Sequence, residues 1–440
     1  MRTAVVVIGA GVAGLSAARH LRGQGREVLV LDARDRIGGR LWTLHPDGLT
    51  VPVELGGEFL HGETPEIERI SREARLRAMD IAGRRFISTP DDLRPMDDFW
   101  ERLDRVMRRL DPDRDPDRSF AAALERMRAL APADRQIARQ FVEGFHAADT
   151  RLASESALAE GGSPRGDVRE RRIGRLIEGF GALVDALAAP VADAIRLRTV
   201  VTRVSWSTGN VIVESRSADG ATEQYLASAA IITVPLGVLQ AVSGQPGVIE
   251  FDPPVPAVQR AAQGLAMGNV VKVALRLDEP FWTGKRFAKR MGDERLDTLS
   301  FLHSSEPVAF PVWWTPYPIK APLLMGWCGG PTARALAGMT AEEVVAGAID
   351  SLATILGMRR HAVQRHVVSG YTHDWMSDPF SRGAYSYVRV GGGDAARKLA
   401  RPVQQTLFFA GEHADRDGRN GTVHGAMASG LAAAREALRA

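Results

Sequence analysis

The stretch VVVIGAGVAGLSAARHL, residues 5–21, decides the fold of the N-terminal region. Its four leading apolar residues are typical of a strand that is buried on both faces, and apolar residues after the glycines recur at helical spacing. Between them, Gly9 permits a tight turn, Gly11 lets the backbone approach a pyrophosphate, and Gly14 lets the helix pack closely on the strand. The positive end of the helix would then face the phosphates. This pattern predicts a strand–turn–helix unit that binds a dinucleotide.

A second apolar strand is predicted over residues 28–31, and it ends in Asp32, eighteen residues after Gly14. A carboxylate at this place binds a ribose hydroxyl, which favours NAD or FAD over NADP. Gly38, Gly39 and Arg40 follow, and they would bring a second backbone turn and a cation to the same pyrophosphate. FAD, which is buried along its length, needs such a second clamp. Taken alone, the segment could also be an ordinary turn beside a solvated arginine.

Motifs distributed along the chain resemble the flavin amine oxidase family, which includes monoamine oxidases, polyamine oxidases and lysine-specific histone demethylases. The resemblance covers most of the chain and is weakest over residues 66–170. Five motifs carry it, and they are residues 6–40, 54–62, 233–239, 268–273 with 279–282, and 375–388 with 407–413 and 421–426. Five motifs in the family's order are far more specific than one glycine-rich turn.

The resemblance implies an α/β fold in which a Rossmann-like (GR2-type), doubly wound FAD-binding domain is joined to a second, α+β substrate-binding domain. We expect a discontinuous FAD-binding domain formed by residues 1–65, 185–262 and 398–440, and a substrate-binding domain formed by residues 66–184 and 263–397. The first part of the substrate domain reads as arginine-rich helix and the second as mainly antiparallel sheet. Further strands are predicted over residues 199–204, 211–214 and 230–234, and a loop over residues 161–167.

FAD is expected to bind non-covalently, because Ala384 stands where monoamine oxidases carry the cysteine that links the flavin. Glu412, after a predicted strand at residues 407–410, could accept a hydrogen bond from a ribityl or ribose hydroxyl. A helix over residues 423–438 would direct N–H groups and its dipole at the flavin pyrimidine. The expected cofactor-binding residues are Gly9, Gly11, Gly14, Asp32, Ala33, Arg34, Gly38, Gly39, Arg40, Leu55, Gly56, Gly57, Glu58, Val201, Trp375, Gly411, Glu412, Thr422 and Val423.

Three residues are expected to be catalytic: Lys272, Tyr385 and Thr422. Lys272 lies in a predicted apolar strand, residues 270–277, where a lysine is unfavourable unless it faces water or a partner. Composition alone favours a lysine that faces solvent, whereas the resemblance implies a lysine linked by a water to flavin N5, the atom that receives hydride. Tyr385 aligns with one aromatic wall of the family's amine-binding cage. Thr422 stands at the other wall, which is often aromatic, so the expected cage is half open.

His61 and Tyr385 are the expected substrate-binding residues. His61 falls where polyamine oxidases carry a residue that helps to select the substrate, although a packing role is an equal alternative. Glu58 could pair with a cationic substrate or lie outside the pocket, and Trp375 is expected to pack near the flavin. No metal site is expected, because the ten histidines are scattered and no ligand group occurs at metal-binding intervals.

The expected function is that of an FAD-dependent amine oxidase, which oxidises a primary or secondary amine, a mono- or polyamine, by hydride transfer to flavin N5. The imine would hydrolyse to an aldehyde or ketone, and O2 would reoxidise the flavin to give hydrogen peroxide. L-amino acid oxidation is an alternative, although no arginine for a carboxylate follows Gly56 and Gly57. A non-catalytic FAD-binding scaffold is a second alternative, which an intact Lys272 disfavours.

Composition sets the remaining expectations. The chain has 440 residues, 45% of them hydrophobic, which is enough for two or more cores. Its net charge of +3 gives no reason to expect nucleic acid or a membrane as partner. The single cysteine, Cys328, excludes an intramolecular disulfide and fits a reducing compartment. A first strand near Thr3 leaves no room for a signal peptide, and the apolar residues 4–18 are too few to span a bilayer. We expect a cytoplasmic, bacterial protein, for which a homodimer is one assembly and the sequence does not fix the oligomeric state.

Overall fold

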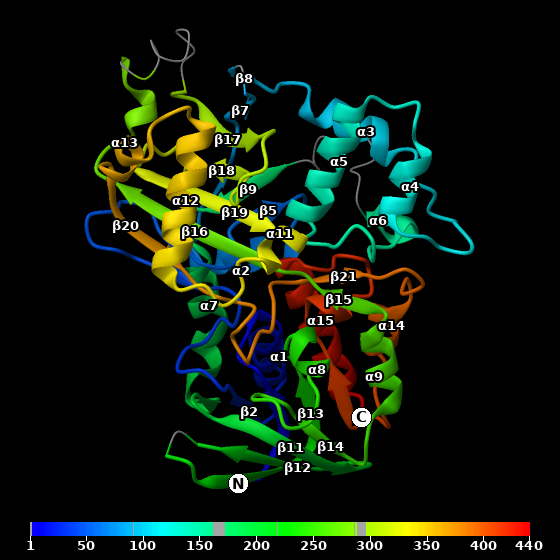
Figure 1. Ribbon diagram of the computed structural model, residues 1–440. Coiled ribbons are helices and arrows are strands. Elements are labelled where there is room, and N and C mark those ends of the chain that lie inside the picture. Colours follow the sequence, from blue (N-terminus) through cyan, green and yellow to red (C-terminus); the bar gives the residue numbers. More distant parts are fainter. Residues whose placement is uncertain (1, 91, 162–171, 218, 286, 288–295) are drawn as a thin grey trace.

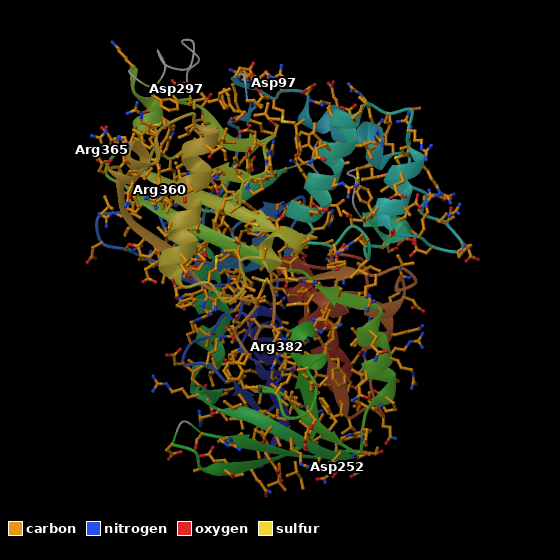
Figure 2. All side chains as sticks on the ribbon, in the orientation of Figure 1. Asp97, Asp252, Asp297, Arg360, Arg365 and Arg382 are labelled. Carbon is orange, nitrogen blue, oxygen red and sulfur yellow. The ribbon has the colours of Figure 1, made fainter. Side chains whose placement is uncertain are left out.

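The computed structural model describes residues 2–90, 92–161, 172–217, 219–285, 287 and 296–440, and two large sheets organise the chain (Figure 1). The lower part of the view holds one sheet and both ends of the chain, and the upper part holds the other sheet with a helical layer beside it. Charged side chains extend from the outside of both parts, for example Asp252 below and Arg360 above (Figure 2). No helix of the described residues is long and apolar enough to cross a membrane.

The first sheet has the strand order β10-β2-β1-β13-β12-β11-β14, and β22 pairs with the end of β13. Its centre is parallel, because β1 pairs in parallel with both β2 and β13, and β13 with β22. The strands are β1 (Arg2–Ile8), β2 (Val28–Leu31), β10 (Ile195–Arg196), β11 (Val200–Ser207), β12 (Asn210–Arg216), β13 (Thr222–Ile232), β14 (Glu250–Asp252) and β22 (Leu407–Phe409). Apolar residues on both sides of the central strands are buried, as their uninterrupted runs predicted.

Helices cover both faces of this sheet, so the doubly wound arrangement is confirmed. One face packs against α1 (Val12–Gly23), α2 (Pro65–Ala74), α7 (Phe180–Ala188) and α15 (Val423–Ala437). The other packs against α8 (Leu236–Leu239), α9 (Pro256–Gln263) and α14 (Ala395–Leu399). Most of α2 and the first half of α7 lie within residues 66–184, which the sequence assigned to the substrate domain. Their apolar faces are instead buried against α1 and α15, because residues such as Ile67 and Leu183 complete the core of the first sheet.

The second sheet has the order β20-β16-β19-β18-β17-β7-β8, and all its neighbouring pairs are antiparallel except β17 with β7. Its strands are β7 (Arg84–Ser88), β8 (Leu93–Pro95), β16 (Val270–Leu277), β17 (Leu299–Ser304), β18 (Val312–Trp314), β19 (Leu323–Gly329) and β20 (Val367–Thr372). One face is covered by α12 (Ala341–Ile355) and α13 (Arg360–Gln364) through a common core. The mainly antiparallel sheet predicted for this region is therefore confirmed.

A helical layer lies beside the second sheet and consists of α3 (Phe99–Met107), α4 (Phe120–Arg126), α5 (Pro132–Gly144) and α6 (Glu155–Gly161). Its arginines lie on outer faces, where Arg102 and Arg105 pair with Asp134. Except for Gly161, which ends α6, the predicted loop at residues 161–167 lies outside the described residues.

The remaining elements are short. They are β3 (Thr43–Leu44), β4 (Val53–Glu54), β5 (Leu60–His61), β6 (Ala78–Asp80), β9 (Ile173–Leu176), β15 (Leu265–Met267), β21 (Ser386–Val388), α11 (Gly330–Arg334), and the 3-10 helices η1 (Ala189–Ala194), η2 (Phe281–Thr283) and η3 (Glu412–Ala414). Several of them border the cavity described next.

Candidate active site

One cavity of about 1020 Å³ is lined by residues of both sheets and of the helical layer. This volume lies at the upper end of the range for ligand sites in proteins. Every residue that the sequence assigned to the cofactor, the substrate or catalysis lines this cavity, with the exception of Gly14. Segments from the two chain ends and the middle of the chain therefore converge on a single site.

The glycine-rich turn after β1 has the conformation that a phosphate cradle needs. Gly9 has a φ of +110°, and a Cβ on Gly14 would lie 1.9 Å from the carbonyl oxygen of Gly9, so helix and turn are in direct contact. Gly14 thus acts by packing rather than by lining the cavity. A Cβ on Gly11, by contrast, would meet no atom within 4 Å. Gly11 is also the N-cap of α1, so the open space beside it faces the positive end of a twelve-residue helix, which suits a pyrophosphate.

Asp32 follows β2 and borders the same cradle. Its Oδ2 accepts a hydrogen bond from the Ala10 amide at 2.7 Å, and its Oδ1 accepts one from the Arg34 amide at 2.8 Å. Burial raises the pKa of Asp32, although these two amides act in the opposite direction. A carboxylate oxygen accepts more than one hydrogen bond, so Asp32 can still receive a ribose hydroxyl. The fixed carboxylate therefore fits the adenosine end of FAD, near Val201 of β11.

The two arginines assigned to the cofactor have different roles. Nη2 of Arg34 donates to Asp378 at 2.9 Å and to Ser381 at 2.8 Å, so its charge is neutralised within the protein. Arg40 donates through Nη1 to the Ala384 carbonyl at 2.7 Å and to Glu412 at 2.8 Å. Its Nε and Nη2 have no hydrogen-bond partner in the described part of the chain. Arg40 therefore keeps donors for a phosphate, whereas the guanidinium of Arg34 instead ties down a neighbouring loop.

Glu412 has several hydrogen-bond partners within the protein. Besides Arg40, its carboxylate accepts hydrogen bonds from the Ser386 hydroxyl at 2.6 Å and the Gly421 amide at 2.9 Å. Burial alone would raise the pKa of Glu412, but Arg40 and its other neighbours hold that pKa below its ordinary value. The carboxylate thus joins Arg40, Ser386 and Gly421 beneath the cavity. Glu412 also lines the cavity, and its hydrogen bond to a cofactor hydroxyl stays a prediction.

Lys272 is buried rather than facing solvent, with its side chain only 2% exposed. Its Nζ donates to Glu58 at 2.7 Å and to the Gly56 carbonyl at 3.1 Å. Glu58 also accepts from the Trp314 indole at 2.9 Å and lies 3.3 Å from Arg175. Burial acts to raise the pKa of Glu58, but Lys272 and Arg175 lower it below its ordinary value. Glu58 is thus neither a free partner for a cationic substrate nor outside the pocket, because it holds Lys272 in place.

Two of the three donor positions of the Lys272 ammonium are used by these contacts. The Nζ also lies 5.4 Å from the ring centre of Trp314, but no hydrogen bond among the described residues takes the third donor. Because Lys272 lines the cavity, this donor is available to a water or a ligand there. The geometry is compatible with the water-binding role that the family resemblance implies.

The hydroxyl groups of Tyr385 and Thr422 are hydrogen-bonded within the protein, so these residues present other groups to the cavity. The Tyr385 hydroxyl donates to the Phe145 carbonyl at 2.7 Å, and burial raises its pKa, with the Glu412 charge adding to the effect. Tyr385 therefore offers its ring and not a base. Thr422 is the N-cap of α15: its hydroxyl accepts from the Gly425 amide at 3.0 Å and donates to the Arg419 carbonyl at 2.7 Å. Thr422 thus positions the helix, a role that the sequence did not assign to it.

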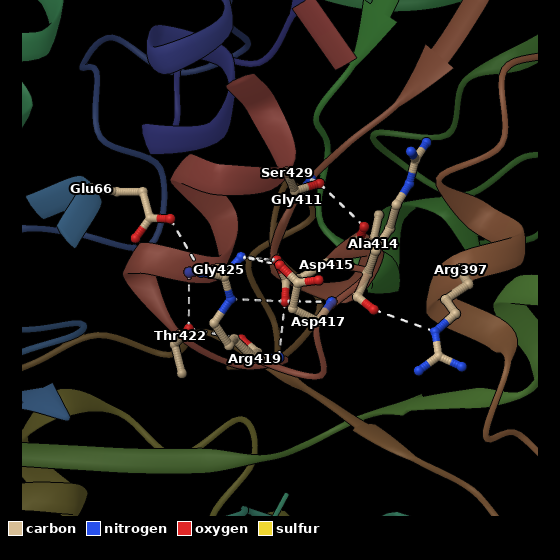
Figure 3. Close-up of polar contacts among 11 residues, drawn as sticks. Glu66, Arg397, Gly411, Ala414, Asp415, Asp417, Arg419, Thr422, Gly425 and Ser429 are labelled. Carbon is tan, nitrogen blue, oxygen red and sulfur yellow. Dashed lines mark hydrogen bonds and ion pairs between the residues drawn. The ribbon is translucent and has the colours of Figure 1, made fainter. Parts of the chain in front are cut away.

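The loop that leads into α15 is fixed by Arg419 (Figure 3). Its guanidinium lies 2.9 Å from both Asp415 and Asp417 and 3.1 Å from Glu66. The ion pairs connect α2 with this loop, so they hold the first turn of α15 against the cavity. These carboxylates neutralise the charge of Arg419, so the guanidinium is not available to a ligand.

The remaining wall of the cavity is aromatic. His61 of β5 makes edge contacts with Phe59 and Phe145, and burial lowers its pKa to about 4, so it is neutral. Trp375 donates to the Leu55 carbonyl at 2.9 Å and is buried. The sequence did not identify the other aromatic residues of the wall, which are Phe99, Trp100, Phe141, Phe145, Phe301, Trp314 and Trp327. Alternation in β17 and β18 hints at them, but it does not reveal which face lines a cavity.

Comparison with known proteins gives consistent results. A family model described as flavin containing amine oxidoreductase matches residues 12–438. Polyamine oxidase 2 of Arabidopsis thaliana is 30% identical, over 98% of this chain and 87% of that protein. Polyamine oxidase 4 of Oryza sativa subsp. japonica is 29% identical, over 98% of this chain and 88% of that protein. The solved structure of wild-type putrescine oxidase bound to putrescine matches with a TM-score of 0.80 over the whole of both chains at 24% identity, a likeness of fold.

Proposed function

The chain belongs to the flavin containing amine oxidoreductase family, and we propose that it oxidises an amine that binds between Tyr385 and Lys272. The observation that carries the proposal is the single cavity, which joins the glycine cradle, Asp32 and Arg40 at one end to Lys272, Tyr385 and an aromatic wall at the other. The dinucleotide end would hold FAD without a covalent link. Bound there, FAD supplies the acceptor for the two electrons of the C–H bond beside the amine nitrogen.

The protein's own residues would bind and orient the amine in its neutral form. Burial in the cavity penalises a charged ammonium more than a neutral amine, and the neutral His61 supplies no charge that would compensate. The Tyr385 ring would hold the nitrogen in place, since its hydroxyl is already bound to Phe145. No side-chain base is required in this proposal, because the amine enters without its proton.

Lys272 would hold a water at the third donor of its ammonium. Glu58 and the Gly56 carbonyl fix the other two donors, so the position of that water is set by groups on three separate segments. We propose that this water supports the step in which O2 takes up the electrons and hydrogen peroxide leaves. Release of the imine to water would then give an aldehyde or ketone.

Three further expectations belong to this proposal. The division into two discontinuous domains would follow the two sheets, with α2 and most of α7 moved to the FAD-binding domain. A cytoplasmic location is supported by Cys328, a buried cysteine with a free thiol. A homodimer is the assembly that sedimentation of the purified protein would test.

The experiment that tests the proposal is an anaerobic titration of the purified flavoprotein with a panel of mono-, di- and polyamines and L-amino acids. We expect at least one amine to bleach the oxidised flavin spectrum and air to restore it with formation of hydrogen peroxide. Bleaching by L-amino acids alone would establish the amino acid oxidase alternative. Bound flavin that no compound of the panel bleaches would refute the proposal in favour of a non-catalytic scaffold.

A further inference from the structure

Arg85 on β7 points into the cavity. Along this strand Phe86 and Ser88 are buried on one face, whereas Arg85 and Ile87 line the cavity on the other, as the two-residue period of a strand requires. The neighbouring Arg84 is exposed and lies 3.2 Å from Asp97 at the outer edge of the molecule (Figure 2). Two consecutive arginines therefore face opposite environments.

Arg85 lacks the counter-charge that other cavity arginines have. Arg34, Arg40 and Arg419 each pair with a carboxylate. In the part of the chain that the structure describes, the guanidinium of Arg85 makes no ion pair or hydrogen bond. Burial lowers the pKa of Arg85 to about 10, and no neighbouring acid offsets this effect. A cation removed from bulk water without a partner is unfavourable, so its retention indicates an anion that arrives with a ligand.

Three aromatic rings surround this cation. Cζ of Arg85 lies 4.3 Å from the ring centre of Phe301, 5.1 Å from that of Phe99 and 5.3 Å from that of Trp100. Ring faces stabilise a cation only partly, by roughly 0.5–2 kcal/mol each. They also fix the guanidinium in one orientation, which reduces the entropy that binding a planar anion would cost.

His303 provides a second polar group beside Arg85 that no partner satisfies. Its ring stacks on Phe99 with centres 5.4 Å apart, and its Nε2 is buried without a hydrogen-bond partner. Burial, and then the charge of Arg85, lower the pKa of His303 to about 3, so the ring is neutral. A neutral imidazole can donate one hydrogen bond to an anion. Arg85 and His303 together place a cation and a neutral imidazole on the same part of the cavity wall.

The strand order gives the distance between this site and Lys272. Both residues lie on the cavity face of the second sheet, with Lys272 on β16 and Arg85 on β7. Four strand spacings separate these strands, or about 19 Å at about 4.8 Å per spacing. Paired residues cross the sheet in one row from Lys272 through Trp327, Val312 and His303 to Ile87, two residues from Arg85. An α-amino acid, whose amine and carboxylate share one carbon, is too short to engage both residues.

We infer that Arg85, assisted by His303, binds a carboxylate at the far end of the amine substrate. The inference rests on the proposed function and deepens it, because it makes the substrate an ω-amino carboxylate in place of a plain alkylamine or a polyamine. A guanidinium binds a carboxylate through two parallel hydrogen bonds, which also fixes the direction of the chain. The second ammonium of a diamine would face Arg85 and be repelled.

The first test compares three straight-chain substrates of matched length on the wild-type holoenzyme: an ω-amino acid, the alkylamine and the diamine. Each is used in a homologous series, and kcat/KM is measured from oxygen consumption. We expect the best ω-amino acid to exceed the alkylamine by roughly ten- to a hundredfold, the effect of one charge-assisted hydrogen-bonded pair. Equal values for the ω-amino acid and the alkylamine, or a preference for the diamine, would overturn the inference. This comparison needs no variant.

The second test uses Arg85→Met and, as a matched control, Arg84→Met on the same strand. Arg85→Met should lower kcat/KM for the ω-amino acid far more than for the alkylamine, while Arg84→Met should leave both unchanged. Arg85→Lys should recover part of the preference for the ω-amino acid over the alkylamine. The lysine ammonium restores the positive charge, but it cannot form the two parallel hydrogen bonds of a guanidinium. An equal loss for both substrates in Arg85→Met would indicate a structural role and contradict the inference.

A binding measurement separates failure of the inference from failure of the proposed function. Straight-chain carboxylic acids, which carry no amine and cannot be oxidised, are titrated into wild-type and Arg85→Met protein by calorimetry. We expect binding to the wild type that weakens roughly tenfold or more in Arg85→Met. Binding without oxidation of any amine would sustain the carboxylate site and refute the proposed function. Oxidation of amines without carboxylate binding would sustain the proposed function and refute the carboxylate site.

Discussion

The role of each polar residue in this cavity depends on which hydrogen-bond and ion-pair partners its side chain has within the protein. Lys272 and Glu58 form a pair in which both side chains are buried, and Glu58 also accepts a hydrogen bond from Trp314 and forms an ion pair with Arg175. Breaking such a pair is costly because one charge is left without its partner. The arrangement therefore indicates that the position of the Lys272 ammonium matters more than its contribution to stability.

Lys272→Met tests this argument. We expect FAD to remain bound, because the cofactor contacts come from other segments, and turnover to fall roughly a hundredfold, the effect of removing one positioned donor. Stopped-flow measurement of reduction and reoxidation would show which step has slowed. Lys320→Met, at an exposed position, is the control and should behave as the wild type. Unchanged kinetics in Lys272→Met would remove Lys272 from the active site.

His413 predicts how stability depends on pH. Its ring is fully buried, neither nitrogen has a hydrogen-bond partner, and burial lowers its pKa from 6.5 to about 4. Below pH 6.5 the unfolded chain binds a proton that the folded chain does not, so the stability associated with a neutral His413 is present above pH 6.5 and is lost as the pH falls toward 4.

We therefore expect His413→Asn to reduce the pH dependence of the free energy of unfolding by up to about 1.4 kcal/mol per pH unit in this window. Urea unfolding across the window measures the slope. His45→Asn, at an exposed position, should leave the slope as it is in the wild type. A slope that His413→Asn does not change would mean that His413 binds its proton while folded.

At the scale of elements, substitution of two glycines at the start of α1 should have different effects, one on stability and the other on the affinity for FAD. Gly14→Ala places a Cβ against the Gly9 carbonyl oxygen, so we expect loss of roughly 1–3 kcal/mol of stability, as for overpacking. Gly11→Ala places its Cβ in open space, so the apoprotein should keep its stability while the Kd for FAD rises, because the methyl group would occupy the cradle. Thermal unfolding and flavin fluorescence measure the two effects.

Gly23→Ala, at the other end of the same helix, is the control for this pair. No atom lies within 4 Å of its Cβ position, and alanine favours a helix by roughly 0.5–1 kcal/mol over glycine. Gly23→Ala should therefore raise the unfolding midpoint slightly and leave FAD binding unchanged. If Gly11→Ala bound FAD as tightly as the wild type, the cofactor would have to lie elsewhere.

The sequence predicted those elements whose pattern is local. β2 and β16 have the predicted bounds, because β2 is an uninterrupted apolar run and β16 is apolar except for Lys272 and Arg276, and α15 differs from its prediction by one residue. β13 was predicted as residues 230–234 but extends over Thr222–Ile232, because its first half pairs with β12 and carries exposed residues. The packing of α2 and α7 against the first sheet was not predicted for a similar reason. An amphipathic helix shows that one face is buried but not against which sheet.

In the candidate site, the positions of the cradle glycines and of residues at strand ends could be predicted from the sequence. The tight turn after β1 requires glycines, and residues at the ends of parallel strands lie at one edge of the sheet. The partners of charged side chains were not: Arg34 pairs with Asp378 and Arg40 with Glu412, each more than three hundred residues away. Arg85 had no local signal either, since its neighbour Arg84 is equally charged and lies on the surface. Only the folded sheet shows which of the two faces a cavity.

For the molecule as a whole, the cavity is where the chain ends meet. The cradle after β1, the strand ends beside Gly411 and the start of α15 surround one space, and Glu412 joins Arg40, Ser386 and Gly421 beneath it. A ligand that fills this space touches residues of both sheets at once. FAD should therefore act as a cross-link between them, binding the folded chain and not the unfolded one.

Removal of FAD should consequently lower the stability of the entire chain. A ligand present at a hundred times its Kd stabilises the folded state by about 2.7 kcal/mol, so the unfolding midpoint of reconstituted apoprotein should rise with the logarithm of the FAD concentration.

Cys328 offers an independent probe, because it is fully buried and burial raises the pKa of its thiol to about 12. Its reaction with a thiol reagent requires unfolding of the second sheet, whose core contains it. If FAD slows that reaction although the FAD cradle belongs to the first sheet, the two sheets unfold together. If FAD protects only the first sheet, labelling of Cys328 will proceed at the rate of the apoprotein.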